Sequence, residues 1–431
     1  MAAEHFDIIV IGLGGFGSAA LYWAARTSGP RTAHGKRILG LEQFNLGHHH
    51  GSSQDHSRII RLAYDSPAYT RIAPAAYMMW AAVEEESGVQ LVHKTGGLVF
   101  GDKDDVHVDK YARAMEDQGI PFQDMSGEEA MKRWPQLTLS KDERVLYQAD
   151  AGIVDPAKAN AVHVTLALAH GAEVIEHARV LRLVALGKDK CQVITEQVTP
   201  TPSAYTTPGQ KTTRKEVTYT CSRVILATGA YTNFCLKSLG VKLPLTITKE
   251  QVTYWATPHL KLFSPKVFPV WITYHTNSSG GQKVLNECYG FPVYGEVATK
   301  AGVHHGGKEI SIDDLVAGKR DIKEVDYDAL HRLETVLKEK IPLFIGKRLY
   351  TKPCLYENTK DYELVMDTLE ACGYPQISVA LGSGHGFKWA SFIGLVLSQL
   401  ANKGKSSYPI DSFRIDRPTL GFERLPASSA L

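Results

Sequence analysis

A glycine-rich turn near the N-terminus constrains the fold of this chain more than any other feature. Residues 6–11 (FDIIVI) form a short apolar run rich in β-branched residues, which is typical of a buried strand. A Gly-x-Gly-x-x-Gly pattern follows it directly, with its glycines at Gly12, Gly14 and Gly17. Residues 18–26 are expected to be helical, and residues 37–42 to form a second strand. This order predicts a β-α-β unit of the kind that binds a dinucleotide.

Each glycine of such a turn has its own physical reason. The first permits the tight turn, the second lets the backbone approach the pyrophosphate, and the third lets the helix pack on the strand. The N-terminus of the helix then favours the negative phosphates. Glu42 ends the second strand, where a carboxylate can accept hydrogen bonds from the adenosine ribose. The unit predicts a bound dinucleotide and leaves open whether this is FAD or NAD.

Length and composition limit the number of domains and the kinds of partner that the chain can have. A chain of 431 residues is too long for one ordinary core and suits two domains. Lys and Arg total 48 and Asp and Glu total 46, so the formal net charge of +2 predicts neither a nucleic-acid nor a membrane partner. The sequence has no apolar run long enough for a transmembrane helix.

In the rest of the chain, the hydrophobic pattern predicts different secondary structure in different regions. Residues 157–170 and 391–401 are expected to be helical, and residues 180–186 and 192–198 to pair as a hairpin. Between about 243 and 350 the pattern changes to alternating strands with one charged helix, which suits a mixed-sheet domain. The nucleotide-binding domain is therefore expected to be discontinuous in sequence.

Cysteine usage and the chain ends give expectations about the compartment. Six cysteines occur, none in a Cys-x-x-Cys pair, which fits a reducing intracellular compartment. The N-terminus has no basic segment followed by an apolar one, so no secretory signal is expected. The last three residues, Ser-Ala-Leu at 429–431, weakly resemble the Ser-Lys-Leu peroxisomal address. A cytoplasmic or peroxisomal location is expected.

Three consecutive histidines at 48–50 are the feature that could suggest a metal site. Consecutive side chains point in different directions, and no other cluster of ligands accompanies them in the sequence. The segment is therefore expected to be a loop, and no metal is expected.

Four further motifs make the sequence recognisable. In chain order they are residues 51–64 (GSSQDHSRIIRLAY), 289–292 (YGFP) with Lys300 and His304 downstream, 352–356 (KPCLY) and 382–388 (GSGHGFK). In these motifs the chain resembles the monomeric sarcosine oxidase family. That family includes N-methyltryptophan, pipecolate and saccharopine oxidases, which are FAD-dependent amine oxidases of the D-amino acid oxidase superfamily. The resemblance covers nearly the whole chain and implies FAD rather than NAD.

The resemblance implies an α/β fold in which a discontinuous Rossmann-like FAD-binding domain joins a mixed-sheet α+β substrate domain. We expect the FAD-binding domain from residues 1–93, 152–239 and 361–431. The substrate domain is expected from residues 94–151 and 240–360. The resemblance also implies a chain that works as a monomer.

The resemblance further implies how the cofactor is held. Cys354 matches the cysteine that bonds the family's flavin through a ring methyl group. Without the family, Cys354 would be interpreted as an ordinary buried thiol. The other positions that are implied to bind the cofactor are Gly12, Gly14, Gly17, Glu42, Ser57, Gly382, Gly384 and Lys388.

Arg58 and Arg61 lie three residues apart, so both would project to one face if their segment were helical. In the family, the residue matching Arg61 clamps the substrate carboxylate together with the one matching Lys388. A guanidinium offers a two-pronged fit, and an ammonium adds a point charge. The residue matching Arg58 sits near the flavin, where a cation would favour the negatively charged reduced ring. The alternative without a binding role is that both arginines lie on a solvated face. The apolar neighbours Ile59 and Ile60 weaken this alternative, because they favour burial of the segment.

Four more residues complete the implied catalytic set. Lys300 lies eleven residues after Tyr289, which is the family's spacing for the lysine that activates oxygen. A cation in a dry site would stabilise the negative charge that oxygen acquires. His304 matches a family histidine at the flavin face, and Tyr356 matches a tyrosine near the substrate. Taken alone, Lys300 would be a solvated lysine and Tyr356 a packed aromatic residue.

Two departures from the family pattern leave the substrate open. Gln54 stands where sarcosine-cleaving members carry a histidine, so a titrating role there is in doubt. Trp389 follows Lys388, where smaller aromatic residues are usual.

The implied function is oxidation of a secondary amino acid, of the N-methyl or cyclic type, to an imine. Molecular oxygen would be reduced to hydrogen peroxide. The alternatives are a dehydrogenase of the same fold with another electron acceptor, a fructosyl amino acid or saccharopine-type oxidase, and a flavin-binding regulatory subunit without turnover.

Overall fold

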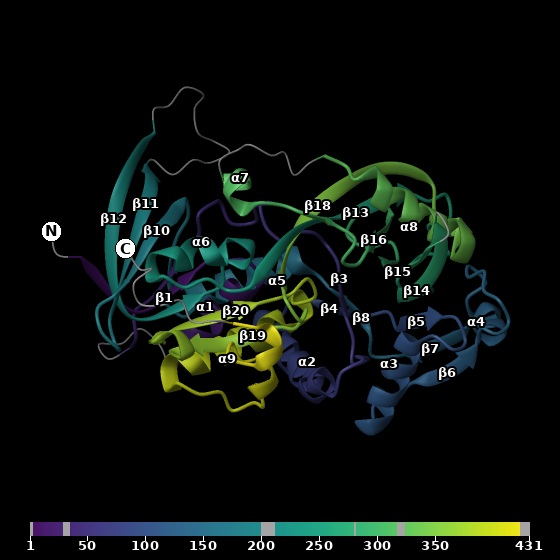
Figure 1. Cartoon of the computed structure of the whole chain (residues 1–431), viewed down its shortest axis with the longest axis horizontal. Coiled ribbons are helices and arrows are strands. Elements are labelled where there is room, and N and C mark those ends of the chain that lie inside the picture. The colour runs from purple at the N-terminus through teal and green to yellow at the C-terminus, as the bar shows by residue number, and fades with distance from the viewer. Residues whose placement is uncertain (1–2, 29–34, 200–211, 280–281, 317–323, 423–431) are drawn as a thin grey trace.

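Two large sheets organise the molecule, and each occupies one half of it (Figure 1). The computed structural model describes residues 3–28, 35–199, 212–279, 282–316 and 324–422. The C-terminal Ser-Ala-Leu, with its weak resemblance to a peroxisomal address, lies outside these ranges.

The first sheet is built on the N-terminal β-α-β unit. The strand β1 (Glu4–Ile11) lies between β2 (Ile38–Leu41) and β12 (Thr213–Leu226) and runs parallel to both. Because β1 is buried by helices and loops on both sides, its apolar run is almost unbroken. The remaining strands of this sheet are β9 (Glu173–Ile175), β10 (Ala178–Ala185), β11 (Cys191–Thr199), β19 (Val365–Leu369) and β20 (Tyr374–Leu381). The expected hairpin is confirmed, since β10 and β11 pair antiparallel.

The second sheet is mixed and has nine strands. In spatial order eight of them are β17 (Lys308–Glu309), β13 (Leu245–Ala256), β16 (Thr299–Val303), β15 (Gln282–Phe291), β14 (Val270–Ser279), β5 (Gly97–Gly101), β7 (Arg144–Gln148) and β6 (Gln123–Ser126). The long strand β18 (Lys347–Thr359) pairs with β13 and runs from the middle of the molecule to the second sheet (Figure 1). A three-stranded sheet contains β3 (Arg58–Ile60), β8 (Gly152–Val154) and β4 (Val92–Lys94). The domain boundaries given above stay a prediction.

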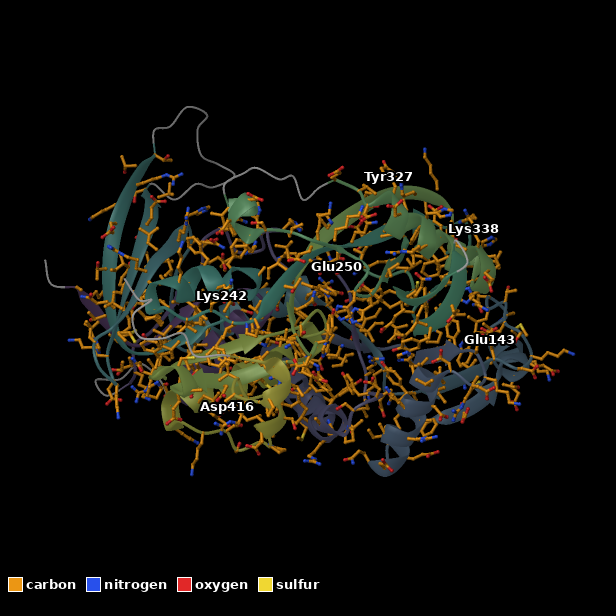
Figure 2. All side chains as sticks on the ribbon, viewed as in Figure 1. Glu143, Lys242, Glu250, Tyr327, Lys338 and Asp416 are labelled. Atoms are coloured by element: carbon orange, nitrogen blue, oxygen red, sulfur yellow. The ribbon has the colours of Figure 1, made fainter. Side chains whose placement is uncertain are left out.

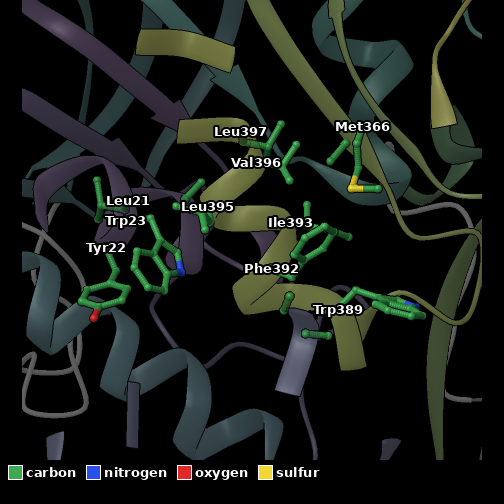
Figure 3. Close-up of a cluster of buried hydrophobic side chains, with 14 of the residues drawn as sticks. Leu21, Tyr22, Trp23, Met366, Trp389, Phe392, Ile393, Leu395, Val396 and Leu397 are labelled. Atoms are coloured by element: carbon green, nitrogen blue, oxygen red, sulfur yellow. The ribbon is translucent and has the colours of Figure 1, made fainter. Parts of the chain in front are cut away.

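Helices cover the first sheet and form the largest apolar core with it. The core places α1 (Gly15–Thr27) against α9 (Ala390–Lys403), with Leu21 and Trp23 on one side and Phe392 and Ile393 on the other (Figure 3). The remaining helices are α2 (Pro67–Ser87), α3 (Val106–Asp117), α4 (Gly127–Arg133), α5 (Pro156–Ala169), α6 (Thr232–Leu236), α7 (Ile312–Val316) and α8 (Tyr327–Lys340).

The second sheet carries its own core under α8. Leu333 and Leu337 of α8 are buried there, whereas Tyr327 and Lys338 lie at the periphery of the molecule (Figure 2). The helix begins where the side chain of Asp326 accepts hydrogen bonds from two backbone N–H groups of its first turn. No helix in the described ranges has both the length and the apolar character needed to cross a bilayer. The α/β fold class predicted from the sequence is confirmed.

Candidate active site

A cavity of about 1050 Å³ is walled by elements of both sheets. Its first-sheet side consists of the glycine turn, the end of β2 and the loop at 382–388. Its second-sheet side consists of parts of β15 and β18, and the loop at 45–55 closes it between them. Of the predicted site residues, the cavity wall contains Gly12, Gly14, Glu42, Arg58, Arg61, Tyr289, His304, Cys354, Tyr356, Gly382, Gly384 and Lys388.

The glycine turn has the shape that a dinucleotide requires. Gly12 has φ +83°, and a Cβ there would lie 2.6 Å from the carbonyl oxygen of Ala227. A Cβ on Gly17 would clash with the carbonyl of Gly12, so Gly17 keeps the helix close to the strand instead of lining the cavity. The N-cap residue of α1, Gly14, has no capping side chain, the Gly15 N–H donates to Ser53 Oγ at 2.8 Å, and the backbone of this helix end faces the cavity. Such a helix end suits a pyrophosphate.

Glu42 lies where the second strand ends, as expected. It is buried, and its carboxylate accepts hydrogen bonds from the backbone N–H of Leu13 at 2.8 Å and of Phe44 at 3.0 Å. Because a carboxylate has about four acceptor positions, Glu42 keeps capacity for the hydroxyls of a ribose. The histidines at 48–50 form a loop beside it. Within the described residues, no group of His, Cys, Asp or Glu could hold a metal ion.

The strand β18 presents Cys354 and Tyr356 to the cavity from alternate positions. Burial raises the pKa of the Cys354 thiol to about 12, and the charges of Arg58 and Lys300 oppose that rise. Glu250, the cross-strand neighbour of Cys354, lies in the interior, where burial raises the pKa of its carboxyl (Figure 2). Cys354 and Tyr356 are therefore available to a ligand in the cavity.

The segment around Arg58 is a strand, so the helix considered above is wrong. β3 pairs antiparallel with β8, and the β-branched Ile59 and Ile60 suit a strand. The Arg58 guanidinium donates hydrogen bonds to the backbone carbonyls of the preceding loop, those of Ser52 (2.8 Å), Gln54 (2.8 Å) and Ser57 (2.9 Å). Arg58 thus holds the loop at 52–57, while Arg61 lies beyond the strand end.

Asp55 is a site residue that the sequence analysis missed. Its carboxylate lies 2.7 Å from Lys300 Nζ, 3.4 Å from Lys352 Nζ and 3.8 Å from Arg58 Nη1. It also accepts a hydrogen bond from the Tyr254 hydroxyl. Burial alone would raise the pKa of Asp55, but Lys300 and Arg58 hold it well below its usual range. Its backbone has φ +123°, a strained conformation for a residue with a side chain, which these contacts maintain.

Lys300 is buried behind the cavity wall. Its ammonium donates to the carbonyl of Ser57 at 2.9 Å and the hydroxyl of Ser57 at 3.1 Å, in addition to its ion pair with Asp55. All three of its N–H bonds therefore have partners inside the protein. Burial lowers the pKa of Lys300 to about 8, and Asp55 opposes that change. Among the described residues, the lining of the cavity includes neither Lys300 nor Ser57, so their predicted contact with a ligand or cofactor is not direct here.

Arg61 and Lys388 bring two positive charges to one part of the cavity. The Arg61 guanidinium lies over the rings of Tyr64 (5.1 Å) and Tyr111 (4.8 Å), and Lys388 Nζ lies 5.7 Å from the Tyr64 ring. Burial and the charge of Arg61 hold the pKa of Lys388 well below its usual value. The buried Nε and Nη1 atoms of Arg61 have no hydrogen-bond partner in the described structure. Unpaired buried donors of this kind fit an anionic ligand.

His304 and Tyr356 meet at the same end of the cavity. The Tyr356 hydroxyl lies 3.4 Å from His304 Nδ1, and Gly384 leaves the space that the Tyr356 ring fills. Burial, Lys388 and Arg61 together lower the pKa of His304 to about 3, so the imidazole is neutral. Tyr289 contacts the His304 ring edge-on, with ring centroids 6.2 Å apart.

Two more acids in the cavity wall were not predicted. Burial raises the pKa of Glu357 to about 7, and its carboxyl accepts a hydrogen bond from the Gly382 N–H at 2.9 Å. Glu287 lines the cavity from β15. Both residues lie next to motifs named in the sequence analysis. A single acidic residue in a strand does not indicate, from the sequence alone, that its side chain faces a cavity. Trp389, noted above as a departure, is fully buried against Tyr64 in the first core.

Residues 7–400 match the family described as DAO, FAD dependent oxidoreductase. The chain belongs to this family. Relatives extend over nearly all of this FAD-dependent oxidoreductase. A monomeric sarcosine oxidase of Streptomyces avermitilis is 31% identical over 95% of this chain and 96% of its own length. The human peroxisomal sarcosine oxidase is 30% identical over 98% and 99%, and the monomeric sarcosine oxidase of Bacillus sp. is 29% identical over 97% of both chains.

Solved structures support the same fold for this FAD-dependent oxidoreductase. NikD, an amino acid oxidase of nikkomycin biosynthesis, superimposes with a TM-score of 0.77 at 22% identity, covering 95% of this chain and 97% of its own. The L-proline dehydrogenase of P. horikoshii superimposes with a TM-score of 0.73 at 20% identity, covering 98% and 100%. The cofactor of the family is FAD, which settles the choice that the glycine turn left open. The glycine turn, Glu42 and the Cys354 wall fit that cofactor.

Proposed function

We propose that this FAD-dependent oxidoreductase is an oxidase of secondary amino acids, of the N-methyl or cyclic type. The observation that carries the proposal is the pair of buried cations, Arg61 and Lys388, in a cavity whose other wall holds Cys354. The relatives named sarcosine oxidase and N-methyl-L-tryptophan oxidase support it. When bound, FAD would supply the two-electron chemistry by which the substrate's carbon–nitrogen unit loses two electrons and two protons to give an imine, and oxygen takes up two electrons and two protons to give hydrogen peroxide.

The side chains of the protein position the substrate for that reaction. Arg61 and Lys388 bind the carboxylate, which fixes the carbon next to the nitrogen in one place. The neutral His304 adds no charge that would repel a cation, and it can exchange a hydrogen bond with Tyr356. The rings of Tyr64 and Tyr111 pack on the Arg61 guanidinium and shield it from water, which strengthens the ionic contact.

An assay of oxygen consumption tests the proposal directly. The purified holoenzyme is given sarcosine, other N-methyl amino acids, pipecolate and proline, and both oxygen uptake and peroxide release are recorded. We expect peroxide in equal amount to the oxygen consumed. Reduction of an artificial dye without oxygen uptake would instead identify a dehydrogenase. If the protein binds flavin but oxidises none of these substrates, the result would favour a flavin-binding protein without catalytic activity.

We also propose that FAD is bonded covalently to Cys354. The position of this thiol in the cavity wall, beside the charges of Arg58 and Lys300, supports the bond. Acid-precipitated holoenzyme should stay yellow, and mass spectrometry should find flavin on the peptide containing Cys354. Cys354→Ala should release all of its flavin on precipitation, whereas Cys372→Ala, in the short 3-10 helix between β19 and β20, should keep it. A colourless precipitate from loaded wild-type enzyme would refute the bond.

The lowered pKa of Lys388 predicts how ligand binding depends on pH. Lys388 binds a carboxylate in its protonated form, so affinity should fall as pH rises through the Lys388 pKa, which lies below that of an ordinary lysine. Calorimetry with a carboxylic acid that lacks an amine measures this without titration of the ligand. Lys388→Met should bind more weakly and lose the pH dependence. An unchanged pH profile in Lys388→Met would assign the dependence to another group.

The proposal extends to assembly and location. We propose a monomer in the cytoplasm or a peroxisome. The names of the monomeric bacterial relatives and of the human peroxisomal relative support these two points.

A further inference from the structure

Glu287 brings an unpaired carboxylate into the cavity that holds Arg61 and Lys388. It lies on β15, whose side chains alternate, so Glu287, Tyr289 and Phe291 share the face that lines the cavity. Its backbone carbonyl accepts a hydrogen bond from His304 N–H at 2.8 Å. Its carboxylate has neither a hydrogen bond nor an ion pair with any residue that the structure describes.

The surroundings of Glu287 contain cations, yet none of them satisfies it. Burial raises the pKa of Glu287, and the charge of Arg61 opposes that change. Lys388 also acts on it electrostatically, but no described cation lies within 4.0 Å of the carboxylate. Arg61 for its part keeps two unpaired nitrogen atoms. The cavity therefore offers unsatisfied groups of both signs at separate points.

Such an arrangement is costly unless a ligand completes it. A buried charge without a partner costs more than a polar group left in water, whereas a direct Glu287–Arg61 contact would remove the cost for both residues. In the described structure the two charged groups line the same cavity without a contact within 4.0 Å of each other. A ligand with one anionic group for Arg61 and one cationic group for Glu287 would satisfy both.

We propose that Glu287 selects the substrate by the charge of its side chain, favouring an amino acid with a second, positively charged group and rejecting one with a second carboxylate. The inference rests on the proposed function, because Arg61 and Lys388 must hold the substrate's own carboxylate. It names a basic secondary amino acid as the preferred substrate class. It also disfavours saccharopine-like substrates, whose additional carboxylates would meet Glu287.

A matched series of substrates tests this selection. Three N-methyl amino acids with side chains of equal length are compared, ending in an ammonium (lysine), a methyl (2-aminoheptanoate) and a carboxylate (α-aminoadipate). We expect wild-type kcat/KM to fall in that order, with at least about tenfold between the first two. Glu287→Gln should reduce that ratio about tenfold and raise the relative rate of the acidic substrate. Glu116→Gln, an exposed acid of α3, should change nothing.

A binding series separates this inference from the proposed function. Calorimetry is done on the holoenzyme with carboxylic acids that carry the same three end groups and no α-amine. The same order of affinity is expected, and Glu287→Gln should abolish it. If no substrate is oxidised but this order of affinity holds, the proposed function fails and the selection by Glu287 stands. An equal loss for all three end groups would make Glu287 a counter-ion of Arg61 and overturn the inference, as would a wild-type preference for the acidic compound.

Discussion

Lys300→Met should slow reoxidation of the reduced enzyme by oxygen by about a hundredfold, while anaerobic reduction by substrate changes far less. Oxygen acquires negative charge in the first step, and a buried cation stabilises that charge strongly because little water screens it. The substrate amine, in contrast, gains no negative charge during reduction. Stopped-flow measurement of the two half-reactions resolves the two effects.

The charge cluster around Asp55 explains how Lys300 can act from behind the cavity wall. Three cations, Lys300, Lys352 and Arg58, share the single carboxylate of Asp55, so the cluster keeps a positive sum. The predicted effect of Lys300 on oxygen would therefore come from its electrostatic field, since the N–H bonds of Lys300 already have partners in the protein. The pKa of Lys300, about 8, further predicts that reoxidation slows as pH rises through that value, because the cation is then lost.

Lys352→Met is the matched comparison for Lys300→Met. Lys352 shares the same carboxylate, but its side chain is 30% exposed and it lines the cavity. If Lys352→Met slows reoxidation and Lys300→Met does not, the oxygen site belongs to Lys352. If Lys300→Met slows both half-reactions equally, the lysine is a structural partner of Asp55 and the oxygen role is wrong.

Arg61→Ala should lower kcat/KM for the best amino acid by at least about tenfold, and Lys388→Ala should do the same. An ionic hydrogen bond contributes about 1.5–3 kcal/mol, and the partners here are buried. The double variant should lose less than the sum of the two single losses, because both groups bind one carboxylate. Steady-state kinetics of the wild type, the two single variants and the double variant measures this coupling between Arg61 and Lys388.

A neutral substrate analogue checks the same clamp from the ligand's side. The amide of the best substrate should be nearly as poor for wild-type enzyme as the acid is for Arg61→Ala. Cations that only captured the substrate by long-range attraction would show a strong salt dependence and little discrimination against the amide. Equal turnover of acid and amide would contradict the clamp, and with it the amino acid assignment.

Local sequence patterns predicted the β-α-β unit well, because its glycines are required by the local backbone conformation of a tight turn. Gly17 is required by its contact with Gly12 inside the β-α-β unit, and Glu42 by its place at a strand end, whereas the space at Gly12 is limited by Ala227, just beyond β12. The other predicted residues that line the cavity belong to the motifs that carry the family resemblance. Their individual roles stay predictions.

The interactions that were missed depend on residues far apart in the sequence. Asp55 meets Lys300 only because β16 packs behind the loop at 52–57, and no spacing rule encodes that contact. The segment at 58–61 was considered as a helix on the basis of three-residue spacing, whereas pairing with β8 decides its conformation. Glu287 is likewise visible as a cavity acid only after β14, β15 and β16 are assembled.

The position of Cys354 on β18 has a consequence for how cofactor and folding are linked. A cofactor held only by contacts stabilises the native state by mass action, so the melting temperature rises with the concentration of free FAD. Under the proposed bond to Cys354, the flavin would instead stay with the chain after unfolding. Its return to the glycine turn is then an intramolecular step, governed by an effective concentration set by the chain itself. Thermal stability would therefore be independent of dilution, and the enzyme could function where free FAD is scarce.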